Sequence, residues 1–164
     1  MNEYKIGQQV MHFREGLSLI VEEKEMSGTL YFIVQPQHEG GEKIYVPVDR
    51  AGAVLRQIIS KEDIDELIKY MSQIRPELFS NTKQRRDVFK RRLASGDIKD
   101  LAYLSMLLYY YRNPEEIDMP VKFGPADVEM LKNANRTLFD ELAIALNIGR
   151  DQVEEHVISI MKQY

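Results

Sequence analysis

Basic side chains are concentrated in one short stretch of the 164-residue chain. Residues 83–92 hold six basic residues and one acidic residue, a net charge of +5, whereas the other 16 basic and 25 acidic residues give −9. The six are Lys83, Arg85, Arg86, Lys90, Arg91 and Arg92. Because segregated positive charge suits the phosphates of a polyanion, this stretch is a candidate nucleic-acid contact.

If the stretch is helical, its charge is poorly placed for a purely structural role. Lys83, Arg85 and Arg86 fall in or near the first turn, where the helix dipole disfavours cations. Arg86 and Lys90 form a like-charged pair one turn apart, which also destabilises a helix. Bound phosphates would relieve both penalties. The alternative interpretation is a solvated face that is neutralised by acidic neighbours such as Asp97 and Asp100, and the sequence leaves both open.

Three consecutive tyrosines occupy positions 109–111. On a helix, successive residues are spread over most of the circumference, so the three rings cannot all face one core. A tyrosine ring can stack on a base or fill a pocket in a partner protein. The alternative is that two rings pack against neighbouring helices while the third covers the surface.

The residues that usually carry catalysis or bind metals are missing or scattered. There are no cysteines, and the three histidines are isolated from one another at His12, His38 and His156. Glu154 and Glu155 precede His156, but the second histidine of a zinc-protease helix is absent. We therefore expect no enzymatic activity, metal, cofactor or small-molecule substrate. An unrecognised hydrolase or metal enzyme is the rival interpretation from a different functional class.

The chain also carries no recognisable membrane or export signal. No apolar run approaches the roughly 20 residues that a membrane span needs. The opening residues, MNEYK, do not resemble a signal peptide. These observations predict a cytoplasmic protein without a membrane partner.

The first 59 residues predict a small β-barrel. Apolar runs rich in branched or aromatic residues occur at 11–13, 17–21, 30–34 and 44–48. Turn signals separate them at 15–16, 27–28 and 40–41. Short, closely spaced strands favour closure into a barrel, which removes exposed edges.

Residues 60–164 predict a domain of about five helices, which makes the chain α+β. The first is indicated by an apolar stripe at Ile64, Leu67, Ile68 and Met71, with Ser60 and Asp63 as a capping box. The others are expected over 82–94, ended by Gly96; over 98–112, capped by Asp97; from Pro125 to a stop at Gly149; and over 151–162. Residues 73–81 and 113–124 are expected to be connections.

The order of these features resembles the CarD-like transcriptional regulators. The opening YKIGQQV at 4–10, VPV at 46–48 and AVLRQII at 53–59 are similar to family segments in the first half. LASGD at 93–97 and the helix from Met130 to Ala143 are similar to segments of the second half. The resemblance covers nearly the whole chain, with both halves in family order.

The resemblance implies that residues 1–59 form a Tudor-like, SH3-like barrel shared with the transcription-repair coupling factor. This barrel would bind the β subunit of bacterial RNA polymerase, and the helical domain at 60–164 would contact promoter DNA at the upstream edge of the bubble. We assign the DNA contacts to Lys83, Arg85, Arg86, Lys90 and Arg91. From strand position, the polymerase contacts are expected at Tyr31, Ile33, Lys43 and Tyr45, with main-chain edge pairing.

One position departs from the family pattern. Members that act on open promoters carry a tryptophan at the start of the basic helix as a minor-groove wedge, whereas this chain has none and places Thr82 or Lys83 there. Contacts to the DNA backbone do not need the wedge, but stabilisation of the bubble does. The alternative function is therefore a polymerase-binding or other protein-interaction module without DNA contact.

Overall fold

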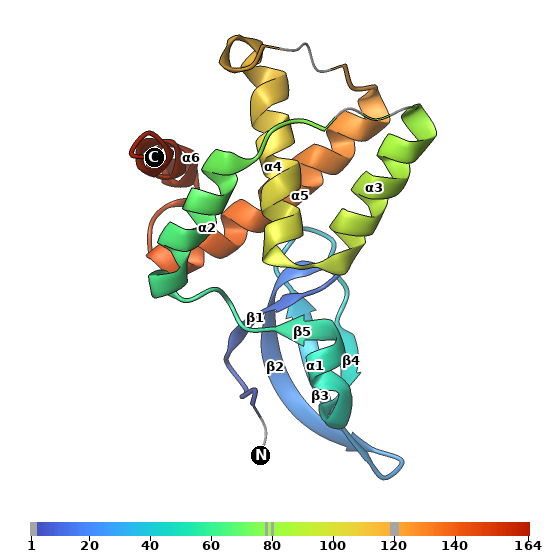
Figure 1. Ribbon diagram of the computed structural model, residues 1–164. Coiled ribbons are helices and arrows are strands. Elements are labelled where there is room, and N and C mark those ends of the chain that lie inside the picture. The colour runs from blue at the N-terminus through green and yellow to red at the C-terminus, as the bar shows by residue number, and fades with distance from the viewer. Residues whose placement is uncertain (1–2, 78, 80, 119–121) are drawn as a thin grey trace. The chain divides into compact units, whose positions relative to one another are not determined.

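A computed structural model of the protein describes residues 3–77, 79, 81–118 and 122–164. The chain divides into two compact units, Met1–Ile58 and Ile59–Tyr164, here termed the sheet unit and the helical unit. The first is built around an antiparallel sheet and the second around helices (Figure 1), which confirms the predicted α+β class. In the described part of the chain, no helix has the length and apolar character needed to cross a membrane.

The sheet unit contains five antiparallel strands in the order β4-β3-β2-β1-β5. The strands are β1 Gln9–His12, β2 Gly16–Met26, β3 Thr29–Pro36, β4 Ile44–Pro47 and β5 Leu55–Arg56. A 3-10 turn, η1 at Val48–Arg50, and a four-residue helix, α1 at Ala51–Val54, connect β4 to β5. The four predicted strands are present, but β2 extends five residues beyond the apolar run at 17–21 that indicated it.

The part of β2 beyond the predicted run pairs with the first half of β3 and forms a hairpin arm. Ser27 and Gly28 at its tip both have positive φ, 50° and 81°, as a tight two-residue hairpin turn requires. The arm of β2 is polar and exposed over residues 22–25. It shows no alternation of apolar and polar residues, which explains why the sequence pattern did not reveal it.

The sheet packs one face into a small core. That core holds Tyr4, Val10, Ile20, Phe32, Val34, Val46, Ala51 and Leu55. The Tyr4 hydroxyl donates a hydrogen bond to the Leu55 carbonyl at 3.1 Å, and a bulge after Ile20 changes the register of β2 against β3. Over the described residues, β4 and β5 are the two edges of this antiparallel sheet and do not pair with each other. Barrel closure stays a prediction.

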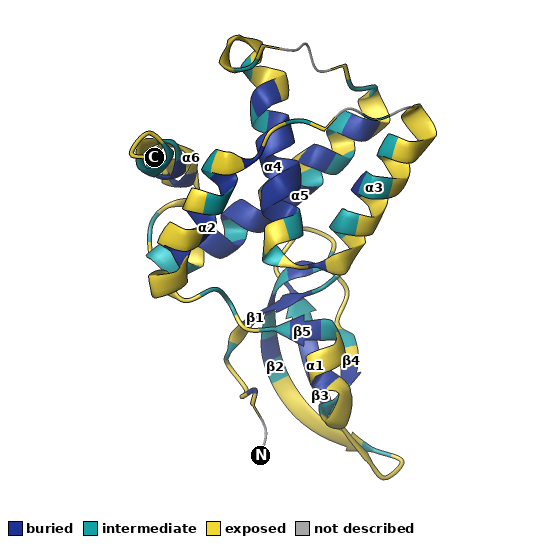
Figure 2. Cartoon of the chain, viewed as in Figure 1, coloured by how far each residue is buried: buried dark blue, intermediate teal, exposed yellow. Residues whose placement is uncertain are grey.

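The helical unit contains five helices over its described residues. They are α2 Lys61–Gln73, α3 Thr82–Ser95, α4 Ile98–Arg112, α5 Pro125–Leu146 and α6 Val153–Met161, with 3-10 turns η2 at Pro114–Glu116 and η3 at Arg150–Gln152. Helix α4 is buried along most of its length, whereas α3 is exposed over much of its surface (Figure 2). A helix that is apolar almost all round, as α4 is, belongs at the centre of the bundle.

Most local helix signals are confirmed. The predicted stripe of α2 is buried at all four positions. Asp97 caps α4 by accepting hydrogen bonds from the backbone of Lys99 and Asp100, and Gly96 ends α3 with φ 65°. In α5, which begins at Pro125 as predicted, Leu131, Ala134, Leu138 and Leu142 are buried.

Two cap predictions were wrong. Ser60 precedes α2 as expected, but its hydroxyl donates to the Asp63 carboxylate at 2.9 Å and makes no bond to the backbone. Helix α5 ends at Leu146, before the predicted Gly149, because Asn147 takes the left-handed conformation with φ 54°. Asparagine tolerates this conformation better than other residues with a side chain.

Candidate functional site

The rotation of α3 about its axis is set by its few apolar residues. Phe89 is fully buried, and Val88 and Leu93 pack against the same core. At about 100° per residue, Arg85 and Arg92 share this inner side of the helix. Lys83, Lys90 and Arg91 then point away from that side, and Arg86 lies at the boundary, with its Nε 3.8 Å from Asp127 Oδ1. The single basic stretch of the sequence is therefore divided into two sets of cations.

Arg85 is bound to a buried carboxylate. Its Nη2 and Nε donate to Asp127 Oδ2 at 2.6 and 3.1 Å, and the side chains of Arg85 and Asp127 are 17% and 0% exposed. The same oxygen accepts the backbone N–H of Gly124 at 3.0 Å. The guanidinium also lies 5.7 Å from the centre of the Phe123 ring. Arg85 therefore joins α3 to the start of α5.

Arg92 attaches α3 to α4 in a similar way. Its Nη1 donates to Asp100 Oδ1 at 2.9 Å, and its guanidinium lies 3.8 Å from the centre of the Tyr103 ring. Ser95 Oγ donates to the other Asp100 oxygen at 2.7 Å. Arg92 thus fixes the end of α3 against α4. Neutralisation by an acidic neighbour, the alternative interpretation of the basic stretch, holds for this residue.

The outward cations have a different environment. Lys83, Lys90 and Arg91 are exposed, and none of them makes an ion pair within the described residues. Arg86 is also exposed, with 47% of its side chain accessible, but its Nε lies 3.8 Å from Asp127 Oδ1. We define the outer face of α3 as Lys83, Arg86, Lys90 and Arg91. It also carries the exposed Asp87, so its net charge is positive.

The outer face is the part of the predicted DNA-contact set that is free to meet a phosphate. Arg85 is not free, because the carboxylate of Asp127 occupies it. Sequence reasoning missed Asp127, although a signal was present. An acidic residue three positions after the start of a helix, as Asp127 is after Gly124, is the pattern of a helix cap, and Asp127 does accept the Gly124 N–H.

The start of α3 is exposed and polar. The Asn81 side chain caps the helix by accepting the Gln84 N–H at 2.7 Å. Thr82 and Lys83 follow on the surface of the first turn. These are the positions where the resemblance places a tryptophan, and both lie where a partner could reach them.

The predicted polymerase contacts lie on one side of β3 and β4. Phe32 and Val34 enter the core, so Tyr31 and Ile33 alternate to the opposite face, and Tyr45 stands across from Ile33. The Tyr31 and Tyr45 rings meet edge to face at 6.5 Å, and Tyr45 is 50% exposed.

Burial and strand position determine which parts of the predicted polymerase-contact surface a partner can reach. Ile33 is one of the predicted polymerase contacts. However, it is only 4% exposed, so its side chain is not available to a partner. Lys43 is exposed just before β4. Because β4 is an edge of the sheet, its outer main-chain groups have no strand partner among the described residues. Tyr31, Lys43, Tyr45 and this edge therefore form the accessible part of the surface.

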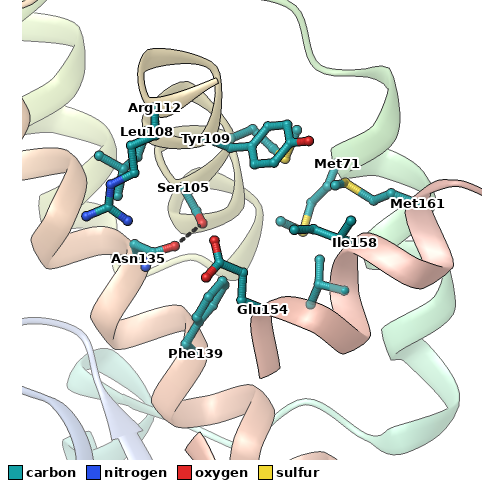
Figure 3. Close-up of a pocket in the computed structure, with 12 residues that line it drawn as sticks. Met71, Ser105, Leu108, Tyr109, Arg112, Asn135, Phe139, Glu154, Ile158 and Met161 are labelled. Atoms are coloured by element: carbon teal, nitrogen blue, oxygen red, sulfur yellow. Dashed lines mark hydrogen bonds between the residues drawn. The ribbon is translucent and has the colours of Figure 1, made fainter. Parts of the chain in front are cut away.

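The helical unit holds a narrow cavity of about 20 Å³ between α2, α4, α5 and α6 (Figure 3). Ser105 Oγ donates to Asn135 Oδ1 at 2.6 Å beside it, and Phe139 and Ile158 line its apolar part. This is room for about one water molecule, not for a substrate. Over the residues described, no three histidine, aspartate or glutamate side chains gather as they would to hold a metal ion.

A sheet unit followed by a helical unit with one outward basic face defines a two-unit α+β protein with a candidate polyanion surface. The family model described as CarD, C-terminal domain, matches residues 66–158, from α2 to α6. The chain therefore belongs to the CarD-like family of non-enzymatic transcription factors, as the sequence motifs indicated, and is a transcription-related protein. No curated protein matches the chain.

Proposed function

We propose that this protein binds the β subunit of bacterial RNA polymerase through residues 1–59 and contacts promoter DNA through residues 60–164, thereby modulating transcription initiation in the cytoplasm. The observation that carries the DNA half is the outer face of α3. Its Lys83, Lys90 and Arg91 have no ion-pair partner in the described part of the chain, and Arg86 is half-exposed. Exposed cations of this kind are suited to neutralising DNA phosphates.

The contact with DNA is expected to be weak and largely independent of base sequence. Lysine and arginine contacts to phosphates fix the position of a protein on a duplex but carry no sequence information directly. The apolar wedge of the family is replaced by Thr82 or Lys83. Polymerase binding would then supply the local concentration that the weak DNA contact needs.

The polymerase half of the proposal rests on the sheet unit. We propose that it is a Tudor-like barrel and that a strand of the β subunit pairs with β4. Edge pairing provides affinity through main-chain hydrogen bonds, and exposed side chains such as Tyr31, Lys43 and Tyr45 add specificity. Ile33 has no part in this version of the surface, because it is buried.

The second candidate function is a polymerase-binding or other protein-interaction module without DNA contact. The missing tryptophan favours it, since no apolar wedge is available to hold unstacked DNA. Under this alternative, the outer face of α3 would meet an acidic protein surface. The two functions differ in whether promoter DNA becomes protected when the protein joins polymerase.

The test combines a pull-down of bacterial RNA polymerase with footprinting on a promoter. The variant Lys90→Glu/Arg91→Glu reverses two outer-face charges, and Lys132→Glu/Arg136→Glu makes the same charge change at exposed positions of α5. We expect all three proteins to retain polymerase, with the upstream DNA protection lost only in the α3 variant. Retention of polymerase without any added protection of promoter DNA would leave the protein-interaction module, and protection that persists in the α3 variant would place the DNA contact elsewhere. Failure of the wild type to retain polymerase would overturn the first half.

A further inference from the structure

A row of aromatic rings leads from the core of the helical unit to its surface beside α3. Phe89 is fully buried, Phe123 is half-buried with its ring centre 5.6 Å from that of Phe89, and Tyr111 lies 5.9 Å beyond Phe123. The Tyr111 and Phe123 rings are tilted by only 35°, so they are partly stacked. Tyr111 is 40% exposed and forms the surface end of the row.

The three consecutive tyrosines have separate roles, as their spacing on a helix requires. Tyr110 is buried and donates its hydroxyl proton to the Ile74 carbonyl at 2.8 Å. Tyr109 is partly buried and contacts the Tyr110 ring. Tyr111 has neither type of anchor, since its hydroxyl makes no hydrogen bond over the described residues. A large ring that is 40% exposed and lies against Phe123 is not needed to close the core.

The surroundings of the row are positively charged. The Arg85 guanidinium lies 5.7 Å from the Phe123 ring centre, and Arg86 approaches the same Asp127 carboxylate. Lys122, next to Phe123 in the chain, is exposed. An exposed aromatic ring with cations beside it suits a base with its phosphate.

Tyr109 and Tyr111 point to different sides of α4, because residues two positions apart are about 200° apart around a helix. Tyr109 packs against the core, whereas the Tyr111 ring lies against Phe123.

We propose that Tyr111, backed by Phe123, is a stacking platform for an unpaired nucleobase, so that the helical unit favours single-stranded DNA next to the duplex held by the outer face of α3. This inference rests on the proposed DNA contact of α3 and adds to it a second site of different chemistry. Every base offers a flat π-face, so the platform discriminates single strands from paired DNA and not one base from another.

The experiment measures binding of the full chain to a single strand of about 15 nucleotides and to the duplex of the same sequence. Tyr111→Phe keeps the ring, and Tyr111→Leu keeps apolar packing on Phe123 without a π-face. We expect Tyr111→Leu to weaken single-strand binding about tenfold and to leave duplex binding within about twofold, while Tyr111→Phe changes neither. Equal losses on both DNAs, or no loss on either, would overturn the platform.

A fluorescence reading gives an independent answer with a variant that preserves the aromatic packing. Because the chain has no tryptophan, Tyr111→Trp introduces a single indole ring as the fluorophore. Its emission should be quenched by the single strand and not by the duplex, while Tyr164→Trp, placed at a 61% exposed position, reports no change with either. Quenching of the Tyr164→Trp control to the same extent, or none at Tyr111→Trp, would contradict the stacking role.

The same assays separate failure of the platform from failure of the proposed function. Lys90→Glu/Arg91→Glu should weaken binding to both DNAs, because both carry phosphates. If that variant loses affinity while Tyr111→Leu leaves the ratio of the two affinities unchanged, only the platform is wrong. If the charge reversal has no effect on either DNA, the proposed DNA contact itself is wrong.

Discussion

The two sides of α3 both carry basic residues, but those on the inner side attach the helix to its neighbours, whereas those on the outer side are exposed. On the inner side, Arg85 and Arg92 are each bonded to a carboxylate and placed over an aromatic ring. On the outer side, Lys90 and Arg91 are exposed and without an ion pair in the described part of the chain. The difference shows that the net charge of a stretch overstates the charge that a ligand can reach, because part of it holds the fold together.

The comparison also explains how a helix with so many cations is stable. A positive charge near a helix start is unfavourable, but Asp127 compensates Arg85 and lies within 3.8 Å of Arg86 there. Bound phosphate is therefore not the only source of relief. The inner arginines attach α3 to α5 and α4, and this attachment determines which cations point outward.

The largest effect is expected from removing Arg85, which is paired with the fully buried Asp127. Arg85→Ala leaves Asp127 charged, fully buried and without its main partner, which should lower the free energy of unfolding by about 3 kcal/mol. Chemical denaturation followed by circular dichroism measures this change. Arg91→Ala, the outer-side control, should cost less than about 0.5 kcal/mol. Equal stability of the two variants would remove the distinction between the two sides of the helix.

A smaller loss is expected at the other inner arginine. Arg92→Ala removes the ion pair with Asp100 and the contact with the Tyr103 ring, but both charged groups are about one quarter exposed. We expect a loss of about 1–2 kcal/mol, most of it from the aromatic contact. Arg92→Lys should retain only part of the stability, because an ammonium group lacks the flat stacking surface of a guanidinium. Full stability of Arg92→Lys would reduce the interaction to simple charge pairing.

The contrast between buried and exposed groups extends to the histidines of the sheet unit. His12 Nδ1 accepts the backbone N–H groups of Arg14 and Glu15 at 3.1 and 3.0 Å, which requires an unprotonated nitrogen, whereas the exposed His38 contacts the Glu15 carboxylate. Burial, followed by the charge of Arg14, lowers the pKa of His12 below its ordinary 6.5. The unfolded chain then binds this proton more readily than the folded one.

Stability contributed by neutral His12 should therefore be complete above pH 6.5 and decline as the pH falls below that value. The measurement is the denaturation midpoint across mildly acidic pH. His12→Asn offers an amide oxygen to the same N–H groups without a titration, so this part of the pH dependence should disappear. An unchanged profile in His12→Asn would assign the acid sensitivity to other groups.

The smallest stability effect is expected at the outer face, where binding should change most. Lys90→Glu/Arg91→Glu should alter the free energy of unfolding by no more than about 0.5 kcal/mol, since both side chains are exposed. Four phosphate contacts give a log–log salt slope of about −3.6, and losing two should bring it to about −1.8. Titration of a duplex at several salt concentrations measures both slopes. A slope that the double reversal leaves intact would place the contacts elsewhere.

Local patterns in the sequence were sufficient to predict several elements. The spacing of Ile64, Leu67, Ile68 and Met71 defines one side of a helix without reference to the rest of the fold. The Gly96-Asp97 break works in the same way, because the left-handed end of one helix and the cap of the next each depend on a single residue. The short helix α1 gave no such signal, since four residues are too few to show a period.

The division of the basic residues was decided only by the tertiary structure. Arg85 and Asp127 are 42 positions apart, so no local pattern pairs them. The sequence determined that six cations lie on one short helix, because helix formation and charge are properties of neighbouring residues. Which of them remain free depends on how Phe89 turns the helix toward the core and on which carboxylates the other helices bring to that side, and these are consequences of packing between distant segments.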